Sequence, residues 1–358
     1  MKTLAAIALG IAVSIALVHH RHATSAKLVP EDASGALSRI AIHYAPNADR
    51  VALGVWKQLF AVLPAAVDVQ VEVAQQADFD RLIRELAGTP NLSRMHPVIV
   101  GTSITTWSRD RYAALDNDTI LAPPRVEAAY ADRAGDANSA AAISRALYHR
   151  EPNTAGFAFE GGDLAATPHF VFADANLAAR NLARGDVDRA SIERELTRRI
   201  SQQLIWLGDH PGEVPQHHIM MYMMPLDDTT VAVGDVRAGV QLLAKEPAGD
   251  SLDLDDTAVQ AARFDRAAEL LAARGFKVVR VPALVLDGGG AFVTYTNAVF
   301  DRRGETRIVY LPTYALPVLD LAAQHFYESQ GFEVHPIDVS SIYKLDGSLG
   351  CLVNVLQR

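Results

Sequence analysis

The sequence predicts an α/β fold in which repeated strand–helix units form one domain. Two C-terminal stretches share the order helix, Gly-Phe, strand, loop, Leu-Asp-Gly and strand: Gly275-Phe276 matches Gly331-Phe332, and Leu286–Gly288 matches Leu345–Gly347. Their spacing of 56 to 59 residues would fit about five such units into the chain. Expected strands and helices also alternate from end to end, and no Pro/Gly-rich linker divides them.

The elements expected before these repeats follow the spacing of the apolar residues. A strand at 41–47 leads to an amphipathic helix at 48–64, a strand at 67–73, a helix at 76–88 and a buried strand at 96–101. Helices are expected at 139–149 and 190–208, each followed by a loop and a strand. Two strands joined at Asp227-Asp228 are expected within 216–235, where alternation would place His218, Met220, Tyr222 and Met224 on one face.

The N-terminus has the pattern of a secretory signal peptide. Lys2 precedes an apolar run over 4–18, and small residues follow at 23–26. The run of about 15 residues is shorter than the roughly 20 that a membrane-spanning helix needs, although retention as an anchor is the alternative. We therefore expect a leader at 1–25, a mature domain at 26–358, an exported location that is periplasmic or secreted, and no stable membrane insertion after cleavage.

The composition narrows the class of partner. The formal net charge is -9, and loss of Lys2 and Arg21 with the leader would make it more negative. An acidic balance argues against nucleic-acid binding and suits a cationic substrate. Hydrophobic residues make up 49% of the chain, which is enough for a large core.

Cys351 is the one cysteine of the chain and cannot form an internal disulfide. In an oxidising compartment such a thiol is either a small buried hydrophobic side chain in a strand or a nucleophile. The repeat aligns it with Phe292, which leaves both interpretations open. A nucleophile would need a base and a polar pocket from elsewhere in the chain.

Three further motifs provide candidates for that pocket. Asp110 follows the strand at 96–101, Glu160 and Asp163 flank paired glycines, and His218 begins an apolar stretch. Each has an ordinary structural explanation when taken alone: an ion pair or cap for Asp110, a turn for the acidic pair, and a core or rim position for the histidine.

Taken in order, these motifs resemble the guanidino-group-modifying enzymes of the pentein fold. That family includes agmatine deiminase, bacterial peptidylarginine deiminase, arginine deiminase and dimethylarginine dimethylaminohydrolase. The similar segments are Trp-Ser-Arg-Asp at 107–110, Glu-Gly-Gly-Asp at 160–163, the histidine segment at 217–228, Tyr-Thr-Asn at 295–297 and Gly-Ser-Leu-Gly-Cys at 347–351. The resemblance spans about residues 38 to 358.

The resemblance implies a five-bladed α/β propeller of ββαβ-type repeats with an active site on its axis. It implies a hydrolase (deiminase) that acts on a guanidino or amidino C–N bond of arginine, peptidylarginine, agmatine or methylarginine. Cys351 would be the nucleophile and form a covalent thiouronium, while Asp110 and Glu160 would hold the guanidinium edges. His218 would act first as the acid and then as the base. The implied mechanism requires no metal and no organic cofactor.

The resemblance also implies a set of substrate-binding residues. Asn297 would help to line the pocket, and Trp107 would wall it through a cation–π contact. Asp163 and Asp287 are candidates to supply a carboxylate that most relatives place two residues after the histidine. The substrate would be a small molecule or a peptide that carries a guanidino group.

Two departures from the family pattern bear on activity. Met220 stands where most relatives have that carboxylate, and the loss of one charge-assisted pair weakens binding by roughly ten- to a hundredfold. Gly350 stands where many relatives have histidine, although the dimethylarginine hydrolase branch is closer here. An alkylated guanidine or another amidine therefore stays open as the substrate, and an inactive pentein that binds a cationic ligand is the alternative function.

A copper site is the rival from another chemical class. Met220, Met221, Met223 and Met224 are soft ligands that suit Cu(I), but strand alternation would divide them between two faces, which favours core packing. The sequence contains no GxxxxGK[ST], GxSxG or HExxH motif.

Overall fold

Five small mixed sheets contain the strands of the computed structural model, which describes residues 26–124, 131–185, 187–247 and 252–358. The expected leader at 1–25 lies outside the described residues. Each sheet begins with an antiparallel pair of strands, and one or two helices then lead to a third strand that runs parallel to the second. This ββαβ order is the unit that the resemblance implies.

The bounds of the elements show how closely the units follow one another. The strands, sheet by sheet, are β4 (Ala113–Leu115), β5 (Thr119–Ala122) and β6 (Asn153–Thr154); β7 (Ala165–Ala166), β8 (Phe170–Asp174) and β9 (Gln203–Leu207); β10 (Met223–Pro225), β11 (Thr230–Asp235), β12 (Lys277–Val285) and β13 (Phe292–Thr294); β14 (Val299–Arg303), β15 (Thr306–Thr313) and β16 (Phe332–Asp338); β17 (Val353–Gln357), β1 (Arg39–His43), β2 (Asp68–Val73) and β3 (Met95–Ile99). The α-helices are α2 (Asp49–Val62), α3 (Gln76–Glu85), α4 (Ser139–Tyr148), α5 (Ala175–Ala183), α6 (Arg189–Arg199), α7 (Val236–Leu243), α8 (Thr257–Ala272), α9 (Pro317–Ser329) and α10 (Leu349–Leu352). Short 3-10 turns are η1 (Pro46–Ala48), η2 (Leu92–Arg94), η3 (Ser108–Arg111), η4 (Ala131–Asn138), η5 (Gly161–Asp163), η6 (Ile219–Met221) and η8 (Tyr343–Leu345).

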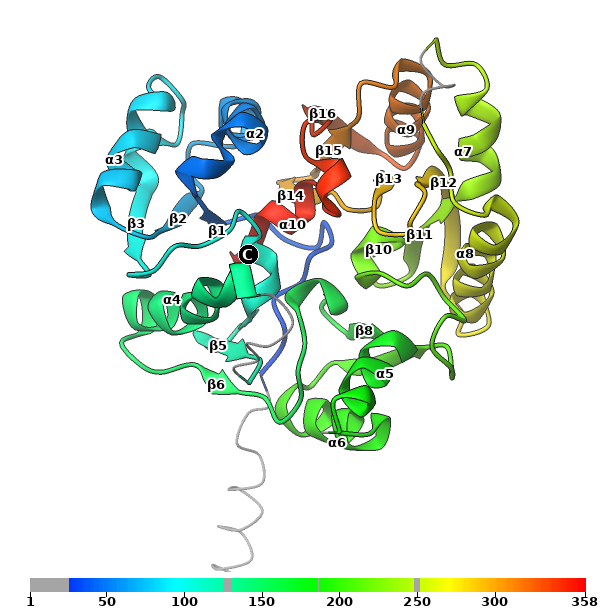
Figure 1. Ribbon diagram of the computed structural model, residues 1–358, viewed down its shortest axis with the longest axis horizontal. Coiled ribbons are helices and arrows are strands. Elements are labelled where there is room, and N and C mark those ends of the chain that lie inside the picture. Colours follow the sequence, from blue (N-terminus) through cyan, green and yellow to red (C-terminus); the bar gives the residue numbers. More distant parts are fainter. Residues whose placement is uncertain (1–25, 125–130, 186, 248–251) are drawn as a thin grey trace, which may run out of the picture.

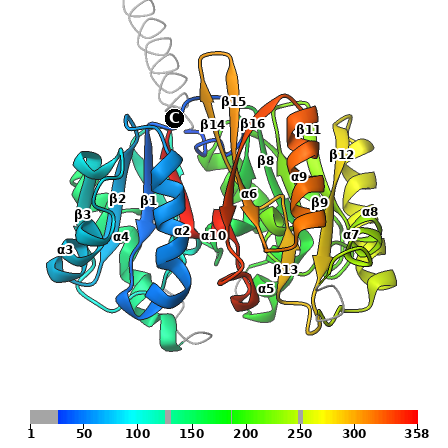
Figure 2. The same cartoon turned by 90° about the horizontal axis from the view of Figure 1, so that it is seen from above.

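One sheet joins the two ends of the described chain. β17 pairs antiparallel with β1, with Ile42 opposite Val353, and β1 then pairs parallel with β2. Figure 1 shows the five sheets distributed around the middle of the molecule, where α10 lies, with the longer helices toward the outside. In the view turned by 90°, α10 again lies between α2 on one side and α7 and α8 on the other (Figure 2).

The outer helices dock through apolar stripes that the sequence already carries. α2 buries Ala52, Val55, Trp56, Leu59 and Phe60, which recur every three or four residues and therefore share one face. Burial of each large apolar side chain stabilises the fold by about 1.5–3 kcal/mol relative to exposure. Such helices cover the outside of the sheets and leave the chain segments near the middle free to form a pocket.

The two C-terminal repeats are equivalent in structure. Gly275 follows α8 with φ +90° and Gly331 follows α9 with φ +81°, and each precedes the parallel strand of its sheet. A left-handed residue at this place lets the chain leave the helix and turn back onto the sheet, and glycine adopts it without strain. The matching Gly-Phe pairs therefore mark the same turn in both units.

Two expected elements differ from the structure. The helix expected at 190–208 ends at Arg199, because β9 takes up 203–207 and buries Ile205, Trp206 and Leu207. The strand expected around 217–224 is instead the turn η6, and only 223–225 is extended. A short run of methionines fits a buried 3-10 turn as well as a strand, so its apolar pattern could not decide between them. Within the described residues, no helix combines the length and the apolar character that crossing a bilayer requires.

Candidate active site

Segments far apart in the sequence meet at one cavity of about 500 Å³. Trp107 directly precedes η3, and Asp110 lies within η3. Glu160 directly precedes η5, His218 directly precedes η6, and Cys351 lies in α10. These short segments pack on one another, η3 against η5 and α10, and η5 against η6. The cavity is lined by Trp107, Asp110, Arg133, Glu160, Arg180, Gln216, His217, His218, Gly290, Leu345, Asp346 and Cys351.

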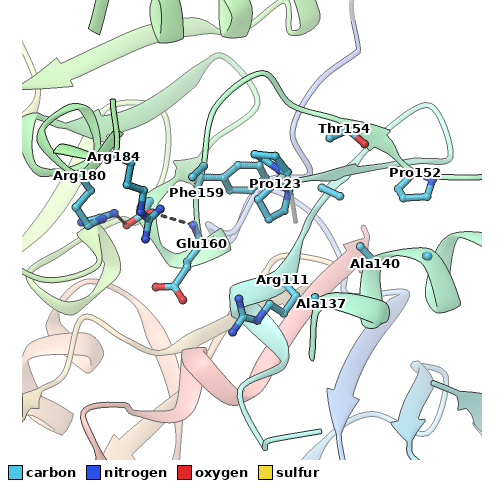
Figure 3. Close-up of a pocket in the computed structure, with 15 residues that line it drawn as sticks. Arg111, Pro123, Ala137, Ala140, Pro152, Thr154, Phe159, Glu160, Arg180 and Arg184 are labelled. Atoms are coloured by element: carbon cyan, nitrogen blue, oxygen red, sulfur yellow. Dashed lines mark hydrogen bonds and ion pairs between the residues drawn. The ribbon is translucent and has the colours of Figure 1, made fainter. Parts of the chain in front are cut away.

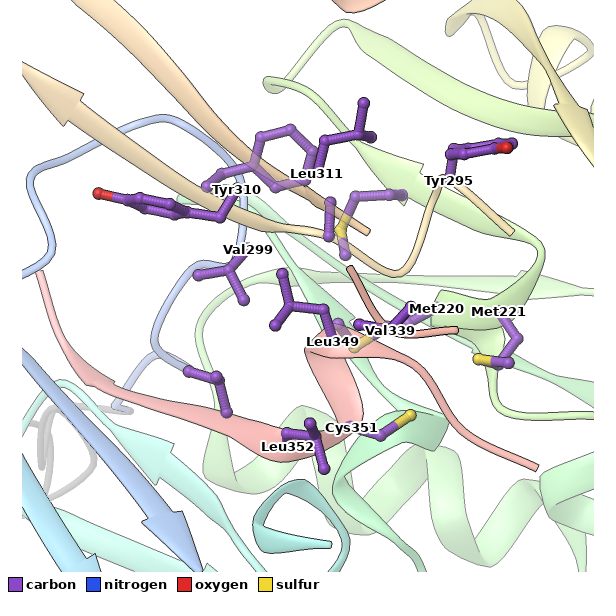
Figure 4. Packing of buried hydrophobic residues seen from close by; sticks show 14 of the residues in the cluster. Met220, Met221, Tyr295, Val299, Tyr310, Leu311, Val339, Leu349, Cys351 and Leu352 are labelled. Atoms are coloured by element: carbon purple, nitrogen blue, oxygen red, sulfur yellow. The ribbon is translucent and has the colours of Figure 1, made fainter. Parts of the chain in front are cut away.

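Cys351 is a buried free thiol in α10, the short helix that directly precedes β17, and is not a strand residue. Its backbone N–H donates to Ser348 O at 3.1 Å and to Asn297 Oδ1 at 3.2 Å, and the Sγ atom lies 3.6 Å from the same Asn297 oxygen. Figure 4 shows the sulfur pointing away from Leu352 at the margin of the packed core. Ser348 O and the Asn297 side chain therefore hold the backbone of Cys351, and the residue lines the cavity.

Gly350 makes this arrangement possible. A Cβ atom at 350 would lie 2.8 Å from Asn297 Oδ1, which is closer than side chains normally approach. The histidine that many relatives carry at this place would therefore displace Asn297. The absence of a side chain at Gly350 therefore leaves room for Asn297 to contact Cys351.

His218 joins the nucleophile candidate to an acidic residue. Its Nε2 atom lies 2.8 Å from Glu160 Oε2, and His218 and Cys351 line the same cavity. Burial alone would lower the pKa of His218, but the hydrogen bonds with Cys351 and Glu160 outweigh burial and raise this pKa well above its ordinary value. For Glu160, burial acts against ionisation, yet the hydrogen bond with His218 and the nearby cations lower its pKa to about 2. The pair is therefore an imidazolium and a carboxylate.

The neighbouring His217 behaves in the opposite way. Burial, followed by the charge of His218, lowers its pKa to about 3, so its ring is neutral. Both histidines line the cavity, which a regular strand would not allow because neighbouring side chains would face opposite sides. The expected alternation of this segment is thus wrong, and the turn η6 is the reason.

Asp110 is 5% exposed and carries its carboxylate into the same cavity. Its Oδ2 atom accepts a hydrogen bond from Arg133 Nη2 at 2.5 Å. Burial and the negative charge of Glu160 raise the pKa of Asp110, against the effect of Arg133 and His218. Among the described residues, none donates a hydrogen bond to Asp110 Oδ1, so this carboxylate keeps a free acceptor.

Two arginines in the cavity were not predicted from the sequence. Arg133 contacts Asp110, and Arg180 forms an ion pair with Asp163. Arg133 stands 23 residues after Asp110 in η4, and Arg180 lies on an otherwise ordinary helix, α5. No local pattern marks either side chain, because each acquires its role only when separate units pack together.

The other predicted substrate-binding residues are placed differently from one another. Asp163 is buried against Arg180 and accepts the Glu160 N–H at 2.9 Å, and it lies 4.0 Å from His218 Nε2. Asn297 is not among the residues that line the cavity and instead holds Cys351. Asp287 is exposed in the turn before Gly290 and accepts the N–H of Gly288, so the structure does not bring it to the cavity.

Met220 belongs to the hydrophobic core and is not a lining residue of the cavity. Figure 4 shows it among buried side chains that include Val339 and Leu349. Its sequence position after His218 therefore does not put the thioether where a second carboxylate would hold a substrate. All four methionines of this segment are buried, and no cluster of three or more His, Cys, Asp or Glu suited to a metal occurs among the described residues.

A second cavity of about 220 Å³ adjoins the first (Figure 3). Glu160 and Arg180 line both cavities, and Arg111 and Arg184 also line the smaller one. In Figure 3 the carboxylate of Glu160 and the ring of Phe159 point in different directions from neighbouring positions. Glu160 and Arg180 therefore stand at the boundary between the two cavities.

Comparison with known proteins gives similarity in structure but not in sequence. No protein-family model matches the chain, and the curated proteins contain no match. Agmatine deiminase of C. jejuni, solved with substrate bound as a cysteine-to-serine variant, has a TM-score of 0.66 at 16% identity and covers 93% of this chain and 96% of its own. Agmatine deiminase of Enterococcus faecalis has a TM-score of 0.66 at 13% identity, with the same coverage.

A dimethylarginine dimethylaminohydrolase is a more distant match. It was solved as a histidine-to-glycine variant in an adduct with S-methyl-L-thiocitrulline, and it has a TM-score of 0.50 at 11% identity, covering 89% of this chain and 99% of its own. These enzymes are all members of the pentein superfamily. The expectation drawn from the five motifs is thereby confirmed at the level of the fold, and the chain described here has the pentein fold.

Proposed function

We propose that this protein is a hydrolase that breaks a C–N bond of a guanidino or amidino substrate through a covalent intermediate on Cys351. One observation carries the proposal: Cys351, His218, Glu160 and Asp110 come from four separate segments and line one cavity. A thiol, an imidazolium and two carboxylates are the groups that attack on a planar cation requires. The deiminase and hydrolase neighbours support this chemical class.

The first half of the proposed reaction forms the intermediate. The carboxylates of Asp110 and Glu160 bind the N–H edges of the substrate guanidinium, and the imidazolium of His218 stabilises the Cys351 thiolate. The Sγ atom adds to the guanidinium carbon and gives a tetrahedral adduct. His218 then donates its proton to the departing nitrogen, the C–N bond breaks, and ammonia or an amine leaves an S-alkylthiouronium.

The second half consumes one water molecule. Neutral His218 takes a proton from the water as the oxygen adds to the thiouronium carbon. The C–S bond then breaks, which restores the thiolate beside the imidazolium, and the ureido product loses the remaining hydroxyl proton to solvent as it leaves. No oxidant, metal or organic cofactor enters this balance.

The proposal also covers the closure of the fold, the location of the protein and the class of substrate. The five ββαβ sheets and the pairing of β17 with β1 support a closed five-bladed propeller with this cavity on its axis. We propose an exported protein, periplasmic or secreted, after removal of residues 1–25. The substrate is a small molecule or peptide such as arginine, peptidylarginine, agmatine or methylarginine, and the acidic net charge of -9 suits such a cation.

An inactive pentein that holds a cationic ligand is the second candidate. It is favoured by the protein's own Arg133, which pairs with Asp110 in the cavity. Such a binder would keep its affinity when Cys351 is replaced by serine and would show no turnover before the replacement.

The test is release of ammonia or amine together with the ureido product. The purified protein is incubated with arginine, an arginine peptide, agmatine and methylarginines, and compared with Cys351→Ala and His218→Ala. His96→Ala is the matched control, because His96 is half exposed on β3 at 3.7 Å from Asp68. Turnover that survives in His96→Ala and disappears in both cavity variants supports the proposal. Absence of turnover on every compound by the folded unaltered protein contradicts it.

A further inference from the structure

Arg133 has an arrangement of partners that none of the proposed catalytic steps uses. Its Nη2 atom lies 2.5 Å from Asp110 Oδ2, its Nη1 atom 3.7 Å from Glu160 Oε1, and its Nε atom 3.3 Å from Asp136 Oδ2. Three carboxylates thus surround one guanidinium, whose side chain is 13% exposed. Both Arg133 and its partners Asp110 and Glu160 line the cavity that contains Cys351.

The chemistry of this contact is that of the proposed substrate. Asp110 and Glu160 are the carboxylates that the mechanism assigns to an alkylguanidinium, and the side chain of arginine is an alkylguanidinium. Asp110 is buried and Glu160 is 24% exposed, and the negative charge of Glu160 opposes ionisation of Asp110 unless a cation lies beside them. A planar fork of N–H donors can reach both carboxylates at once, which a sodium ion or a lysine ammonium does less well.

We infer that Arg133 is an intramolecular ligand of the Asp110–Glu160 site, so that a guanidino substrate binds only by displacing it. The inference rests on the proposed function for the identity of the incoming substrate, and it adds a competitor built into the same chain. A substrate then binds with an apparent affinity reduced by the fraction of molecules whose site is occupied by Arg133.

Asp136 explains how Arg133 stays near the site after displacement. The Asp136 carboxylate is fully buried and accepts hydrogen bonds from Thr105 N at 2.7 Å and Thr105 Oγ1 at 2.6 Å. It therefore keeps a fixed position whether or not the Nη atoms of Arg133 reach Asp110. The contact of Arg133 Nε with Asp136 can persist while the substrate guanidinium replaces the Nη atoms of Arg133 beside Asp110.

The opposite role for Arg133 makes a different prediction. If Arg133 served to bind an anionic group of the substrate, its removal would weaken the binding of arginine, which carries a carboxylate, and would not affect agmatine, which carries none. An intramolecular competitor instead acts against both compounds, because both present the same guanidinium to Asp110 and Glu160.

The experiment measures binding without turnover. Calorimetric titrations with agmatine and with arginine are made in the Cys351→Ala background, with and without Arg133→Gln. Arg145→Gln is the matched control, since Arg145 pairs with Glu151 on the surface and both side chains are more than half exposed. The expected result is binding of both compounds about tenfold or more tighter in Arg133→Gln and unchanged in Arg145→Gln. Arg133→Lys, which keeps the charge for folding but has no planar fork, should lie between the two.

Three results would overturn the inference: unchanged binding in Arg133→Gln, weaker binding of either compound, or no binding by the emptied site. Turnover of the same arginine variants with Cys351 intact separates this inference from the proposed function. Tighter binding in Arg133→Gln without turnover would support Arg133 as a competitor and contradict the proposed hydrolase activity. Turnover with unchanged or weaker binding in Arg133→Gln would support the hydrolase activity and contradict the competitor role.

Discussion

At the scale of single residues, His218 is surrounded by groups that favour its charged form. Glu160 Oε2 lies 2.8 Å from the Nε2 atom of His218, Asp163 Oδ1 lies 4.0 Å from the same atom, and Cys351 lines the same cavity. Because the pKa of His218 is raised in the folded protein, the imidazolium persists above pH 6.5. Its stabilising contribution is fully present below pH 6.5 and is lost as the pH rises through the folded-state pKa.

Glu160→Gln tests this electrostatic account. Loss of the charged acceptor removes one of the two hydrogen bonds that raise the pKa of His218, and a charge-assisted hydrogen bond of about 1.5–3 kcal/mol corresponds to about one to two pH units. An NMR titration of His218 should therefore show a midpoint lower by that amount. Glu151→Gln, on the exposed surface, should leave the midpoint unchanged. The account fails if the two variants titrate alike.

Asn297→Leu tests how Cys351 is held in place. The substitution leaves the Cys351 N–H without its asparagine acceptor and should lower the free energy of unfolding by about 1–3 kcal/mol. Since Asn297 holds Cys351 and does not line the cavity, kcat should fall about tenfold or more while KM changes little. Urea unfolding and steady-state kinetics provide both numbers. A change in KM alone would instead make Asn297 a substrate-binding residue.

Four of the site residues that the sequence indicated line one cavity, and the limits of the sequence prediction have a physical cause. Asp110, Glu160, His218 and Cys351 lie in short motifs whose order could be recognised, and they line one cavity. The sequence could not show that Asp287 lies outside the cavity, because a glycine-rich turn on the surface and one beside a pocket have the same composition. Arg133 could not be found, since only packing between units brings it to Asp110.

At the scale of elements, the site depends on short segments that can approach one another closely because glycine has no side chain. A Cβ atom at Gly162, in η5, would lie 2.6 Å from His218 Nδ1, and one at Gly347 would lie 2.3 Å from the ring of Trp107. Glycine at these positions lets η5 approach the histidine and lets the segment before α10 approach the tryptophan. Among the helices, α7 has a similar close approach, since a Cβ atom at Gly239 would lie 2.0 Å from Ala283 O, whereas Gly54 in α2 has no atom within 4 Å of the added Cβ.

Gly162→Ala should therefore displace His218 and reduce turnover by about a hundredfold, because a misplacement of about 1 Å in a catalytic group has that effect. Gly54→Ala is the matched control on the exposed side of α2, where no atom lies within 4 Å of the added Cβ. It should retain activity and raise the free energy of unfolding by up to about 1 kcal/mol. Equal activity of the two variants would contradict the packing described for η5.

The contrast between long helices and short turns explains which elements could be predicted from the sequence. The helices at 49–62, 76–85 and 139–148 have apolar stripes long enough to identify them from the sequence. The turns η3, η5 and η6 have only three or four residues each, and tertiary contacts decide their conformation. The mistaken strand at 217–224 belongs to this second group, and so did the inference about the face on which Met220 lies.

At the scale of the whole molecule, Arg109 connects parts of the chain that are distant in sequence. It is buried, forms an ion pair with Glu31, and donates to Leu164 O and Asn354 Oδ1, both at 3.2 Å. One side chain thus joins the segment before β1 to η3, to the residue after η5, and to β17. The pairing of β17 with β1 links the same ends of the described chain, and the repeat alone did not predict it.

Arg109→Met should lower the free energy of unfolding by about 3–5 kcal/mol, because it leaves the buried Glu31 carboxylate without its partner. The double variant Arg109→Met/Glu31→Leu should recover part of this loss, since the unpaired charge is then gone. Arg145→Gln, in an exposed pair, should cost about 1 kcal/mol or less. Urea unfolding measures all three, and a double variant no more stable than Arg109→Met would contradict the explanation.

The measurement that tests the account most directly is the intact mass of the unaltered protein, sampled over a range of short incubation times with each guanidino compound and quenched in acid. If Cys351 attacks the guanidinium carbon, the protein mass should increase during turnover by that of the substrate less the ammonia or amine lost. The increase should be absent in Cys351→Ala. No mass increase with any compound, or an increase that persists without Cys351, would contradict a covalent intermediate on this cysteine.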